Sequence, residues 1–508
     1  GVPGAAAGRF AGLSGAGRHS GGGASDHFDL CIIGSGSGNT IVNHEFNDWS
    51  VAIVDQGVGE GEWFGGTCLN VGCIPTKMMV VPADFAASPD RAARLGVELS
   101  RGAVDFAGIQ QRVFGRTNAI STDGLAYRES NENVTVFREA AAFIDAKHLQ
   151  VGDRVITADQ FVLAAGSRPR TLDVPGLNDP DLAGLIHTND TLLRIKTLPK
   201  HLMIVGGGVE ALEFGHIFSA FGSKVTLVHH GARLLRKLDR DLGEAATKLA
   251  AERFSVRLNQ SLSNVEASET GGLIVSTSDS DGIDYDYAVD ALMVAVGREP
   301  NGDLLEVGRA GVTLDDQGFV VVDDQQRTSQ PGIWALGDVT SHHLLKHVAN
   351  AEARTVQHNL VHPDNMIATR RDAVPQAIFS DPPMYSVGPT TDELDAAGTH
   401  YVSIIQPYST VAYGWAMVDD DSFVKLVGDP ATGKLLAAHV VGPEAPELGQ
   451  LCTTAISFGI GAIEMARGQY WAHPELAEVV ENALISLDRA MRHDGDDDSE
   501  HRRRTGEG

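Results

Sequence analysis

Two stretches of this sequence each place a short apolar run directly before closely spaced glycines, and this repeated pattern constrains the fold more than any other feature. The stretches are FDLCIIGSGSGNT at 28–40 and HLMIVGGGVEALEF at 201–214. A strand that ends in glycines and is followed by a helix lets backbone amides approach a pyrophosphate at the helix N-terminus. The pattern therefore predicts two Rossmann-like α/β units in one chain of 508 residues, each able to bind a nucleotide.

The first glycine-rich stretch carries Gly34, Gly36 and Gly38, although Asn39 stands where the strict pattern has glycine or alanine. A second apolar run, VAIV, leads to Asp55 about twenty residues further on. An acid at the end of that strand can hold the hydroxyls of a ribose. These residues predict a dinucleotide site whose ribose is held by a carboxylate.

The second glycine-rich stretch carries Gly206 and Gly208, and its next strand ends in His229 and His230 rather than in an acid. The cations that follow are Arg233, Arg236 and Lys237. An acid at the strand end would favour NADH, whereas its absence beside cations suits the additional phosphate of NADPH. The alternative interpretation is that these cations form an ordinary solvated face.

The composition limits the possible partners of the chain. Its formal net charge is −27, which argues against nucleic acid or an anionic membrane as a partner. No apolar run of about 18 residues appears, so we expect no membrane span. The leader 1–26 lacks the apolar centre of a signal peptide, and the tail 491–508 is a block of acids followed by bases. We expect both ends to be disordered and the protein to be cytoplasmic.

GGTCLNVGC at 65–73 places two of the four cysteines, Cys68 and Cys73, in a glycine-rich frame. In a regular helix their Cα atoms would be about 8.6 Å apart, and a disulfide needs less than about 7 Å. A disulfide therefore requires a distorted turn, which the glycines permit. Zinc would need two further ligands, and Cys31 and Cys452 are isolated in apolar runs where we expect them to be buried. The pair favours redox chemistry, and we expect no metal site.

Two further stretches end predicted strands in residues that suit a nucleotide. YAVDALMVAVGREPN at 287–301 is predicted to be a strand followed by a tight turn at Gly297 and Arg298. GIWALGDVTS at 332–341 is predicted to be another strand, which ends in a glycine and Asp338. An acid just after a strand is well placed to bind a polyol hydroxyl such as those of the FAD ribitol, and the alternative is an ordinary Gly-Asp turn.

Taken in order, these motifs resemble the flavoprotein disulfide reductase family, which includes glutathione reductase and lipoamide dehydrogenase. The resemblance covers about 27–488, and its most specific motifs are GGTCLNVGCIPTK and the HPELAE of QYWAHPELAEVVENALI. Five shorter stretches resemble one actinobacterial branch, whose substrate is the disulfide of a sugar-inositol thiol. They are GSGSGN, RVFGRT (112–117), LLKHVANAEARTVQHNL (344–360), VAYGWAM (411–417) and MARGQYWAHP (465–474).

The resemblance implies two cofactors, FAD and NADPH, and the residues that hold them. FAD contacts are expected at Gly34, Gly36, Asp55, Thr67 and Asp338, and NADPH contacts at Gly206, Gly208, His230 and Arg236. Further expected cofactor-binding positions are Gly38, Gly66, Gly166, Gly297 and Arg298. Lys77 is expected beside the flavin and paired with Glu213. A helix that begins near Lys346 and His347 is expected to point its N-terminus at the flavin.

The resemblance also implies the chemistry. Hydride would pass from NADPH to FAD, and the electrons would then reach a Cys68–Cys73 disulfide. Cys73 is expected to lie against the flavin, and Cys68 to attack the disulfide substrate. His473, with its tautomer held by Glu478, is expected to be the acid–base group and to reach the cysteines of the partner subunit in a homodimer.

Three residues of the second unit depart from the family pattern. Val209 stands where relatives often carry an aromatic residue, Glu210 where an apolar residue is usual, and His230 where an arginine is usual. We expect them to weaken NADPH affinity or to relax the cofactor preference. The stretch VGEGEW at 58–63 is longer than expected before the cysteine motif, which bears on the mouth of the site.

The expected fold class is α/β, with two Rossmann-like nucleotide-binding domains and a C-terminal α+β dimerisation domain. The expected boundaries are 27–171 for the FAD-binding domain, 172–297 for the NADPH-binding domain, 298–372 for a central domain and 373–490 for the dimerisation domain.

Alternatives stay open at this point. A dihydrolipoamide dehydrogenase-type enzyme shares the cysteine motif but prefers NAD, and a glutathione reductase-type enzyme differs in its disulfide. Mercuric reductase and high-molecular-weight thioredoxin reductase need a further C-terminal cysteine pair, and no cysteine follows Cys452. A structural flavoprotein subunit or a redox sensor is the non-enzymatic alternative, which the intact set of Cys68, Cys73, His473 and Glu478 disfavours.

Overall fold

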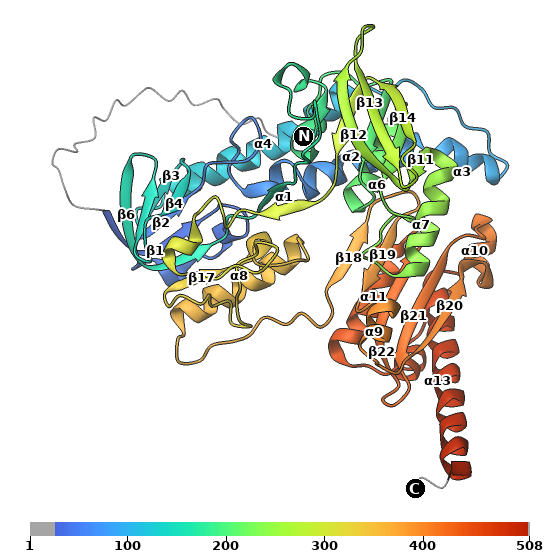
Figure 1. Cartoon of the computed structure of the whole chain (residues 1–508). Coiled ribbons are helices and arrows are strands. Elements are labelled where there is room, and N and C mark those ends of the chain that lie inside the picture. Colours follow the sequence, from blue (N-terminus) through green and yellow to red (C-terminus); the bar gives the residue numbers. More distant parts are fainter. Residues whose placement is uncertain (1–25, 506–508) are drawn as a thin grey trace, which may run out of the picture.

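The structure, a computed structural model, describes residues 26–505, with side chains described to Asp494. Figure 1 shows three units, built around β1–β6 with β17, around β9–β14, and around β18–β22. Residues 1–25 of the expected disordered leader lie outside the described residues. Asp26, the last residue of that expected leader, belongs to strand β1.

A seven-stranded sheet forms the first unit, in the order β3-β2-β1-β6-β5-β4 with β17 paired to β6. β1 runs parallel to both β2 and β6, and its residues Leu30, Cys31 and Ile32 are fully buried. The strands are β1 (Asp26–Ile33), β2 (Val51–Val54), β3 (Val134–Phe137), β4 (Ala141–Phe143), β5 (His148–Val151), β6 (Arg154–Leu163) and β17 (Ile333–Ala335). The segment expected as a central domain thus completes the first sheet.

The helix expected directly after the first glycine-rich loop is not an α-helix. The chain forms two short 3-10 helices there, η1 (Gly38–Thr40) and η2 (His44–Phe46). The Asn43 side chain accepts the backbone N–H of Glu45 at 2.9 Å, and such side-chain bonds compete with helix hydrogen bonds. The other helices of this unit are α1 (Gly66–Asn70), α2 (Cys73–Ala86), α3 (Ser88–Arg94), α4 (Phe106–Glu129) and α8 (Lys346–Val361).

The second unit has an all-parallel sheet in the order β11-β10-β9-β15-β8, next to a three-stranded antiparallel sheet β12-β13-β14. Its strands are β8 (Ile186–His187), β9 (His201–Val205), β10 (Lys224–His229), β11 (Ser255–Leu258), β12 (Gln260–Ala267), β13 (Leu273–Asp279), β14 (Asp284–Val289) and β15 (Ala291–Val294). Its helices are α5 (Asn189–Leu192), α6 (Val209–Phe221) and α7 (Arg240–Arg253). The antiparallel pair β7 (Ser167–Pro169) and β16 (Arg298–Pro300) links the first two units.

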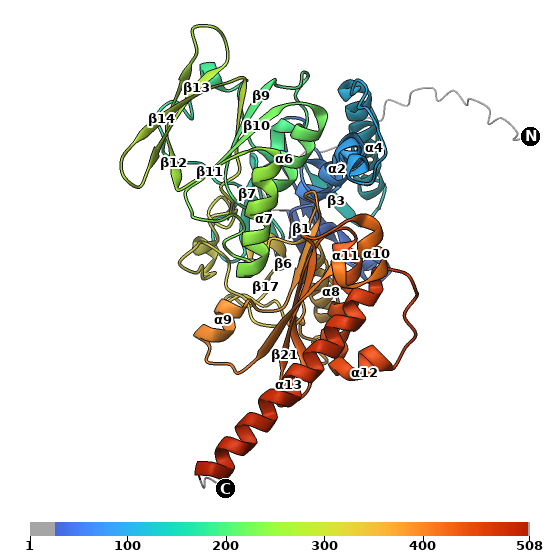
Figure 2. The ribbon, with the colours of Figure 1, turned by 90° about the vertical axis from the view of Figure 1, so that its right-hand side faces the viewer.

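The third unit is an antiparallel sheet in the order β18-β19-β22-β21-β20, covered by helices. Its strands are β18 (Pro375–Ile378), β19 (Met384–Val387), β20 (Val402–Pro407), β21 (Phe423–Asp429) and β22 (Lys434–Val441). Its helices are α9 (Thr391–Ala396), α10 (Ala412–Met417), α11 (Ala445–Phe458), α12 (Ala462–Arg467) and α13 (Ala477–Thr505). Figure 2 shows α13 lying along the sheet and then extending beyond it.

The expectation of a disordered tail from 491 is wrong for the described part. Helix α13 continues to Thr505. Leu487 and Met491 are buried against the third sheet, and Arg492 pairs with Asp488 at 2.8 Å, one turn earlier. A helix already anchored by its apolar face extends more easily than an isolated one forms. Within the described residues, none of the helices is apolar over a length sufficient to cross a bilayer.

Buried contacts join the units. On α2, Met79 and Ala83 share one apolar core with Phe214 and Phe218 of α6, which ties the cysteine-bearing helix to the second unit. Between the second and third units, the almost fully buried Lys425 binds Asp239 at 2.7 Å and Asp241 at 2.6 Å. A buried cation needs such paired acids, since desolvation alone would be costly.

Candidate active site

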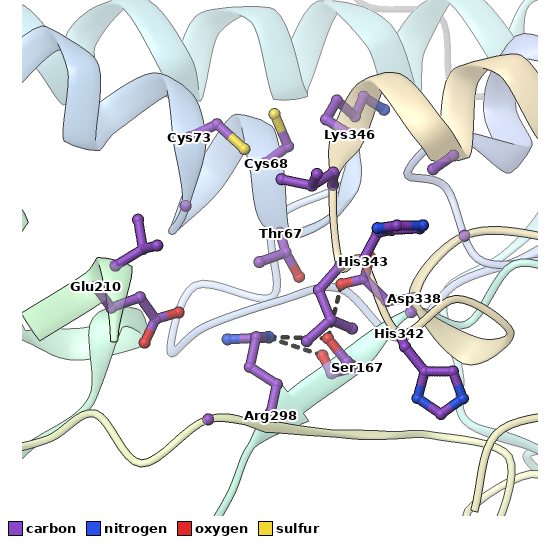
Figure 3. Close-up of a pocket in the computed structure, with 18 of the residues that line it drawn as sticks. Thr67, Cys68, Cys73, Ser167, Glu210, Arg298, Asp338, His342, His343 and Lys346 are labelled. Atoms are coloured by element: carbon purple, nitrogen blue, oxygen red, sulfur yellow. Dashed lines mark hydrogen bonds between the residues drawn. The ribbon is translucent and has the colours of Figure 1, made fainter. Parts of the chain in front are cut away.

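A continuous cavity of about 1670 Å³ runs between the glycine-rich loops of the first and second units. Figure 3 shows Cys68, Cys73 and Thr67 on one side of it, and Glu210, Arg298 and Ser167 across from them. Pockets for one small ligand usually hold about 300–1,000 Å³. The cavity therefore has room for more than one ligand.

The first glycine-rich loop lets backbone approach a ligand closely. Gly34 has φ of 109°, and a Cβ there would lie 2.1 Å from the carbonyl oxygen of Ala164. A Cβ on Gly66 would lie 2.6 Å from the Cα of Gly36. The loop before the cysteines therefore packs directly on the first nucleotide loop, which any side chain at Gly66 would prevent.

Asp55 stands at the end of β2, where a ribose-binding acid is expected. Its carboxylate accepts the backbone N–H of Ser35 at 2.5 Å and of Gly57 at 2.6 Å. The Ser35 hydroxyl accepts the backbone N–H of Gly65 at 2.7 Å. These hydrogen bonds hold the carboxylate rigidly at the carboxyl end of the parallel strands, which is the usual ligand edge of such a sheet.

The cysteine motif folds as two helices that are broken between the cysteines. Cys68 lies in α1, and Cys73 is the first residue of α2. Gly72 between them has φ of −125° and ψ of −120°, so the distorted turn expected from the sequence is present. Both side chains line the cavity, and both are free thiols in this structure rather than a disulfide.

A hydrogen bond between the two thiols shifts their pKa values in opposite directions. This bond lowers the pKa of Cys68, helped by the charge of Lys346 and the backbone N–H of Ile74. It raises the pKa of Cys73, together with burial of that thiol. Cys68 is therefore the first of the pair to ionise, and the thiolate is the nucleophilic form of cysteine.

Asp338 faces the cavity through a small polar network. Its carboxylate accepts the hydroxyl of Ser167 at 2.8 Å, and the same hydroxyl accepts Nε of Arg298 at 2.8 Å. Asn189 accepts a second guanidinium N–H of Arg298 at 3.0 Å. The contacts position Asp338 and Arg298 in the cavity wall between the first and second units, as Figure 3 shows.

The N-terminus of α8 opens into the same cavity. Its first residue, Lys346, donates from Nζ to the hydroxyl of Ser37 at 2.8 Å, and His347 bonds the carbonyl of Pro375 at 2.8 Å. A helix N-terminus carries partial positive charge. It therefore favours a ligand group that is or becomes negative.

The second glycine-rich loop repeats the close approach of the first. Gly206 has φ of 146°, and a Cβ there would lie 2.1 Å from the carbonyl oxygen of Ala295. Gly208 is the N-cap of α6, so the first free amides of that helix face the cavity. This arrangement suits a pyrophosphate.

The end of β10 presents imidazoles where the first unit has a carboxylate. His229 is only 7% exposed, and within the described residues neither of its ring nitrogens has a hydrogen-bond partner. Its ring lies 4.5 Å from that of His230, and Nη1 of Arg236 lies 3.2 Å from Nε2 of His230. Burial, with the charges of His230 and Arg236, lowers the pKa of His229 to about 4.

Lys77 and Glu213 do not form the expected ion pair. Phe379, at the end of β18, lies between them: its ring centroid is 3.9 Å from Nζ of Lys77, and its backbone N–H donates to Glu213 at 3.0 Å. Burial raises the pKa of Glu213 to about 7, and the charge of Glu210 adds to this. The aromatic ring of the third unit thus replaces a direct salt bridge.

His473 and Glu478 lie together, as expected, but away from the cysteines of their own chain. Nδ1 of His473 is 2.8 Å from the Glu478 carboxylate. The His473 side chain is 70% exposed, and neither residue lines the cavity. An acid–base role at the cysteines therefore requires a second chain.

Most of the expected cofactor residues line the one cavity. They are Gly34, Gly36, Asp55, Gly66, Thr67, Gly166, Gly206, Gly208, Glu213, His230, Arg236, Gly297, Arg298, Asp338, Lys346 and His347. Gly38 and Lys77 do not. A Cβ on Gly38 would lie 2.6 Å from that of Ala164, so Gly38 lets the chain pack on the sheet rather than contact a ligand.

Sequence reasoning missed several polar residues of this wall. Ser35 and Ser37 lie between the glycines of GSGSG, and that position was a usable signal. Ser167 had no local signal. Neither had the buried Glu352, which does not line the cavity itself but accepts the backbone N–H of Gly337 at 2.7 Å and an N–H of Arg371 at 3.0 Å, two residues that do.

The cavity fits FAD in the first unit and a pyridine nucleotide in the second. For FAD, the amides of Gly36 and Ser37 are without a hydrogen-bond partner among the described residues, while Asp55 offers a ribose acid and Asp338 a polyol acid. For the pyridine nucleotide, Gly206 offers the same close approach, and His229 offers two buried ring nitrogens that have no partner in the described part of the chain. Unpaired buried polar atoms are costly unless a ligand satisfies them.

Comparison with known protein families agrees with this geometry. The family model described as pyridine nucleotide-disulphide oxidoreductase matches residues 28–355, and that described as the dimerisation domain of the same family matches residues 374–484. The chain belongs to the pyridine nucleotide-disulphide oxidoreductase family. It is a flavoprotein oxidoreductase of class 1.8.1 that uses FAD and a pyridine nucleotide, and the expected fold class is confirmed.

Among individual proteins, the chain is similar to the mycothione reductase of Mycobacterium tuberculosis, with 44% identity over 470 residues, 91% of this chain and 99% of the relative. It is 30% identical to the dihydrolipoyl dehydrogenase of Cupriavidus necator over 484 residues, 92% of this chain and 99% of the relative. The Cu(II) complex of the HOCl-induced flavoprotein disulfide reductase RclA from Escherichia coli superposes with a TM-score of 0.78 at 25% identity, covering 91% of this chain and all of that one. The mycothione reductases are the branch that the five short stretches resemble, so that expected likeness is confirmed.

Proposed function

We propose that the chain reduces mycothione to mycothiol with NADPH, as a cytoplasmic homodimer. The observation that carries the proposal is the Cys68–Cys73 thiol pair in the wall of a cavity that both nucleotide units share. The 44% identity to a mycothione reductase, against 30% to a dihydrolipoyl dehydrogenase, supports this choice of disulfide. The match of residues 374–484 to a dimerisation domain supports the homodimer.

Two thiol–disulfide exchanges account for the reduction. The Cys68 thiolate attacks one sulfur of the substrate disulfide, forms a mixed disulfide and releases the first thiol. His473 of the partner subunit gives that leaving thiolate its proton, and Glu478 orients the imidazole. Cys73 passes its proton to His473 and attacks Cys68, so the Cys68–Cys73 disulfide forms and the second thiol leaves with that proton.

Bound FAD would supply the two-electron link between NADPH and this disulfide. Two features of the chain are positioned for this transfer. Helix α8 directs its positive N-terminus into the cavity, and Cys73, the first residue of α2, lines the same cavity. Both cysteines are then restored as thiols for the next cycle.

NADPH rather than NADH is proposed from the imidazoles and the guanidinium near the end of β10. His229, His230 and Arg236 face the cavity, and among the described residues no carboxylate contributes to the environment of His229. A ribose hydroxyl pair would prefer an acid there, whereas a 2′-phosphate prefers donors and cations.

A substrate panel tests the function. The purified holoenzyme is assayed with NADPH and, separately, mycothione, glutathione disulfide and lipoamide. We expect the specificity constant for mycothione to exceed the other two. A value for glutathione disulfide or lipoamide equal to or above it would contradict the proposed substrate, while the disulfide reductase class would stand.

A mixed dimer tests the role of His473. Cys68→Ser and His473→Gln homodimers should each be nearly inactive. If His473 serves the partner's cysteines, one site of the mixed dimer has both wild-type groups and the other has both defects. Unfolding and refolding the two variants together should restore part of the turnover. Verified heterodimers as inactive as their parents would exclude a His473 that acts across the interface.

A further inference from the structure

The proposed reaction gives no role to the carboxyl group of Glu210 in the cavity wall. Glu210 is the second residue of α6, after the N-cap Gly208 and Val209. It lines the cavity, and Figure 3 shows its side chain reaching from the end of the helix into the open space. In the described part of the chain no hydrogen bond contributes to its charge state. The carboxyl is therefore presented to a ligand rather than to the protein.

The cations near Glu210 have other contacts and do not compensate the charge of an ionised Glu210 carboxylate. The groups that face it or its neighbour Glu213 are Glu213 one turn further on α6, Asp190 on α5, Arg298 on β16, and Cys73 and Lys77 on α2. Arg298 already donates to Ser167 and Asn189. Lys77 contacts the ring of Phe379. Among these groups, acids therefore outnumber cations that have no other contact.

Burial and the neighbouring acids raise the pKa of the carboxyls of Glu210 and Glu213. Burial raises the pKa of Glu210, with Asp190 adding to the effect and Arg298 opposing it. Burial likewise raises the pKa of Glu213 to about 7. Burial therefore favours the protonated form of both carboxyls, which lie one helical turn apart on α6.

The direction of the bound nucleotide follows from the second unit. The strand end at His229 is the position that holds the adenosine ribose in such units, and the amides at the start of α6 hold the pyrophosphate. His229, whose two ring nitrogens have no partner in the part of the chain that the structure describes, marks the adenosine end of the cavity. The nicotinamide end then lies on the other side of the Gly206–Gly208 loop, where Glu210 and Cys73 line the cavity.

We propose that Glu210 is a specificity-determining residue that distinguishes oxidised from reduced nicotinamide by charge. The oxidised ring is a cation and the reduced ring is neutral, so an ionised Glu210 attracts only the oxidised form. The inference rests on pyridine-nucleotide binding, which the family establishes, and not on the identity of the disulfide or on the preference for NADPH.

The sign of the pH dependence follows directly. Below the pKa of Glu210 the carboxyl is neutral and discrimination is lost. Above it, the carboxylate favours the oxidised ring. For unit charges about 6 Å apart, effective dielectric constants of about 80 and 20 give a preference of roughly threefold and roughly a hundredfold. By linkage, binding of the oxidised nucleotide releases up to about one proton near the pKa.

Calorimetric titration of the oxidised holoenzyme tests the proposal without turnover. The probes are NADP⁺ and 1,4,5,6-tetrahydro-NADP, a neutral analogue that does not donate hydride, each from about pH 5.5 to 9. For the wild type we expect the affinity ratio to shift toward NADP⁺ with rising pH by threefold or more. Two buffers of different ionisation enthalpy should report proton release with NADP⁺ only.

Glu210→Gln should bind both probes with a ratio that does not change with pH. Glu210→Leu serves as a second variant, and retained FAD and circular dichroism show that each is folded. Glu244→Gln, on the exposed side of α7, is the matched control and should behave as wild type.

A wild-type ratio that does not depend on pH would overturn the proposal. It would equally be overturned if Glu210→Gln kept the wild-type dependence, or if only Glu213→Gln removed it. The same titrations with NAD⁺ and tetrahydro-NAD separate this result from the cofactor preference. Equal binding of both nucleotide pairs would remove the NADPH proposal and leave the charge discrimination intact.

Discussion

The first and second nucleotide units each have a glycine-rich loop of similar backbone conformation. They differ in the residue at the end of the strand that follows this loop. Gly34 and Gly206 both have positive φ, and a Cβ on either would lie 2.1 Å from a carbonyl oxygen of a neighbouring strand end. In the first unit, Asp55 then accepts two backbone N–H groups. In the second, His229 stands at the equivalent place, and neither of its ring nitrogens has a hydrogen-bond partner within residues 26–505.

This difference separates backbone from side-chain contributions to nucleotide recognition. The glycine loop makes the same close approach in both units, so it serves any pyrophosphate. The strand-end residue carries the selectivity, because a carboxylate suits hydroxyls and an imidazole beside Arg236 suits a phosphate. One scaffold thus holds two different nucleotides in one cavity.

The largest expected effects come from blocking the loops separately. Gly34→Ala should yield protein without FAD, whereas Gly206→Ala should keep FAD but bind the pyridine nucleotide roughly 100-fold more weakly or worse. Each change adds backbone strain of about 1–3 kcal/mol and forces the loop away from the ligand. Flavin absorbance of the purified protein and calorimetric titration with NADP⁺ measure the two losses.

Gly184→Ala is the matched control for this pair. Gly184 belongs to the second unit but does not line the cavity, and a Cβ there would meet nothing within 4 Å. We expect wild-type nucleotide affinity. If Gly184→Ala were as damaging as Gly206→Ala, steric blocking of the strained position would not explain the loss.

A smaller effect is expected at the strand end of the second unit. Arg236→Leu should raise the Michaelis constant for NADPH by roughly 10- to 150-fold, the equivalent of about 1.5–3 kcal/mol for a charge-assisted hydrogen bond. The constant for NADH should change little, since it lacks the 2′-phosphate. Arg257→Leu, on an exposed position of β11, is the charge-matched control. Equal effects on both cofactors would remove Arg236 from the phosphate site.

The smallest expected effect is a stability difference at acid pH. The pKa of His229 is lowered to about 4 from 6.5 by burial, so between these values the unfolded chain binds a proton that the folded chain does not. Stability is therefore complete above about pH 6.5 and falls as pH falls toward 4. Between about pH 8 and pH 5, the free energy of unfolding should therefore fall by about 1–2 kcal/mol less in His229→Asn than in the wild type.

Denaturant unfolding at both pH values measures this change. His44→Asn, on the exposed η2 of the first unit, is the control. His439 is buried in the third unit and its pKa is also lowered to about 4, so wild-type protein should keep some acid sensitivity in His229→Asn. Identical pH profiles for His229→Asn and wild type would show that His229 is not neutral in the folded protein.

Features that depend on a few neighbouring residues could be read from the sequence. Both glycine loops, Asp55, and the turn between Cys68 and Cys73 follow from local patterns, because positive φ, strand ends and helix breaks are decided over a few residues. The two 3-10 helices η1 and η2 were not predicted from these patterns. There the Asn43 side chain competes for backbone hydrogen bonds that the apolar pattern assigns to a helix.

Contacts between segments far apart in the chain were predicted from the sequence less often. The likeness to the family suggested a Lys77–Glu213 pair, yet Phe379 of the third unit occupies the space between them. Ser167 joins Asp338 and Arg298 although they lie far apart in the chain. The polar partner of a buried group is set by packing geometry, which no local pattern records.

Two nucleotide-binding loops, a thiol pair between glycines and the kind of side chain at each strand end are predictable from the sequence alone. These are short-range properties of backbone conformation and charge. Only the folded structure shows that both loops and both thiols share one cavity and that His473 lies outside it. It also shows that Glu210 lies inside the cavity, with no hydrogen-bond partner among the residues that the structure describes. The reason is that long-range packing brings these segments together, and only the folded arrangement decides which charges lose water and which find a counter-charge.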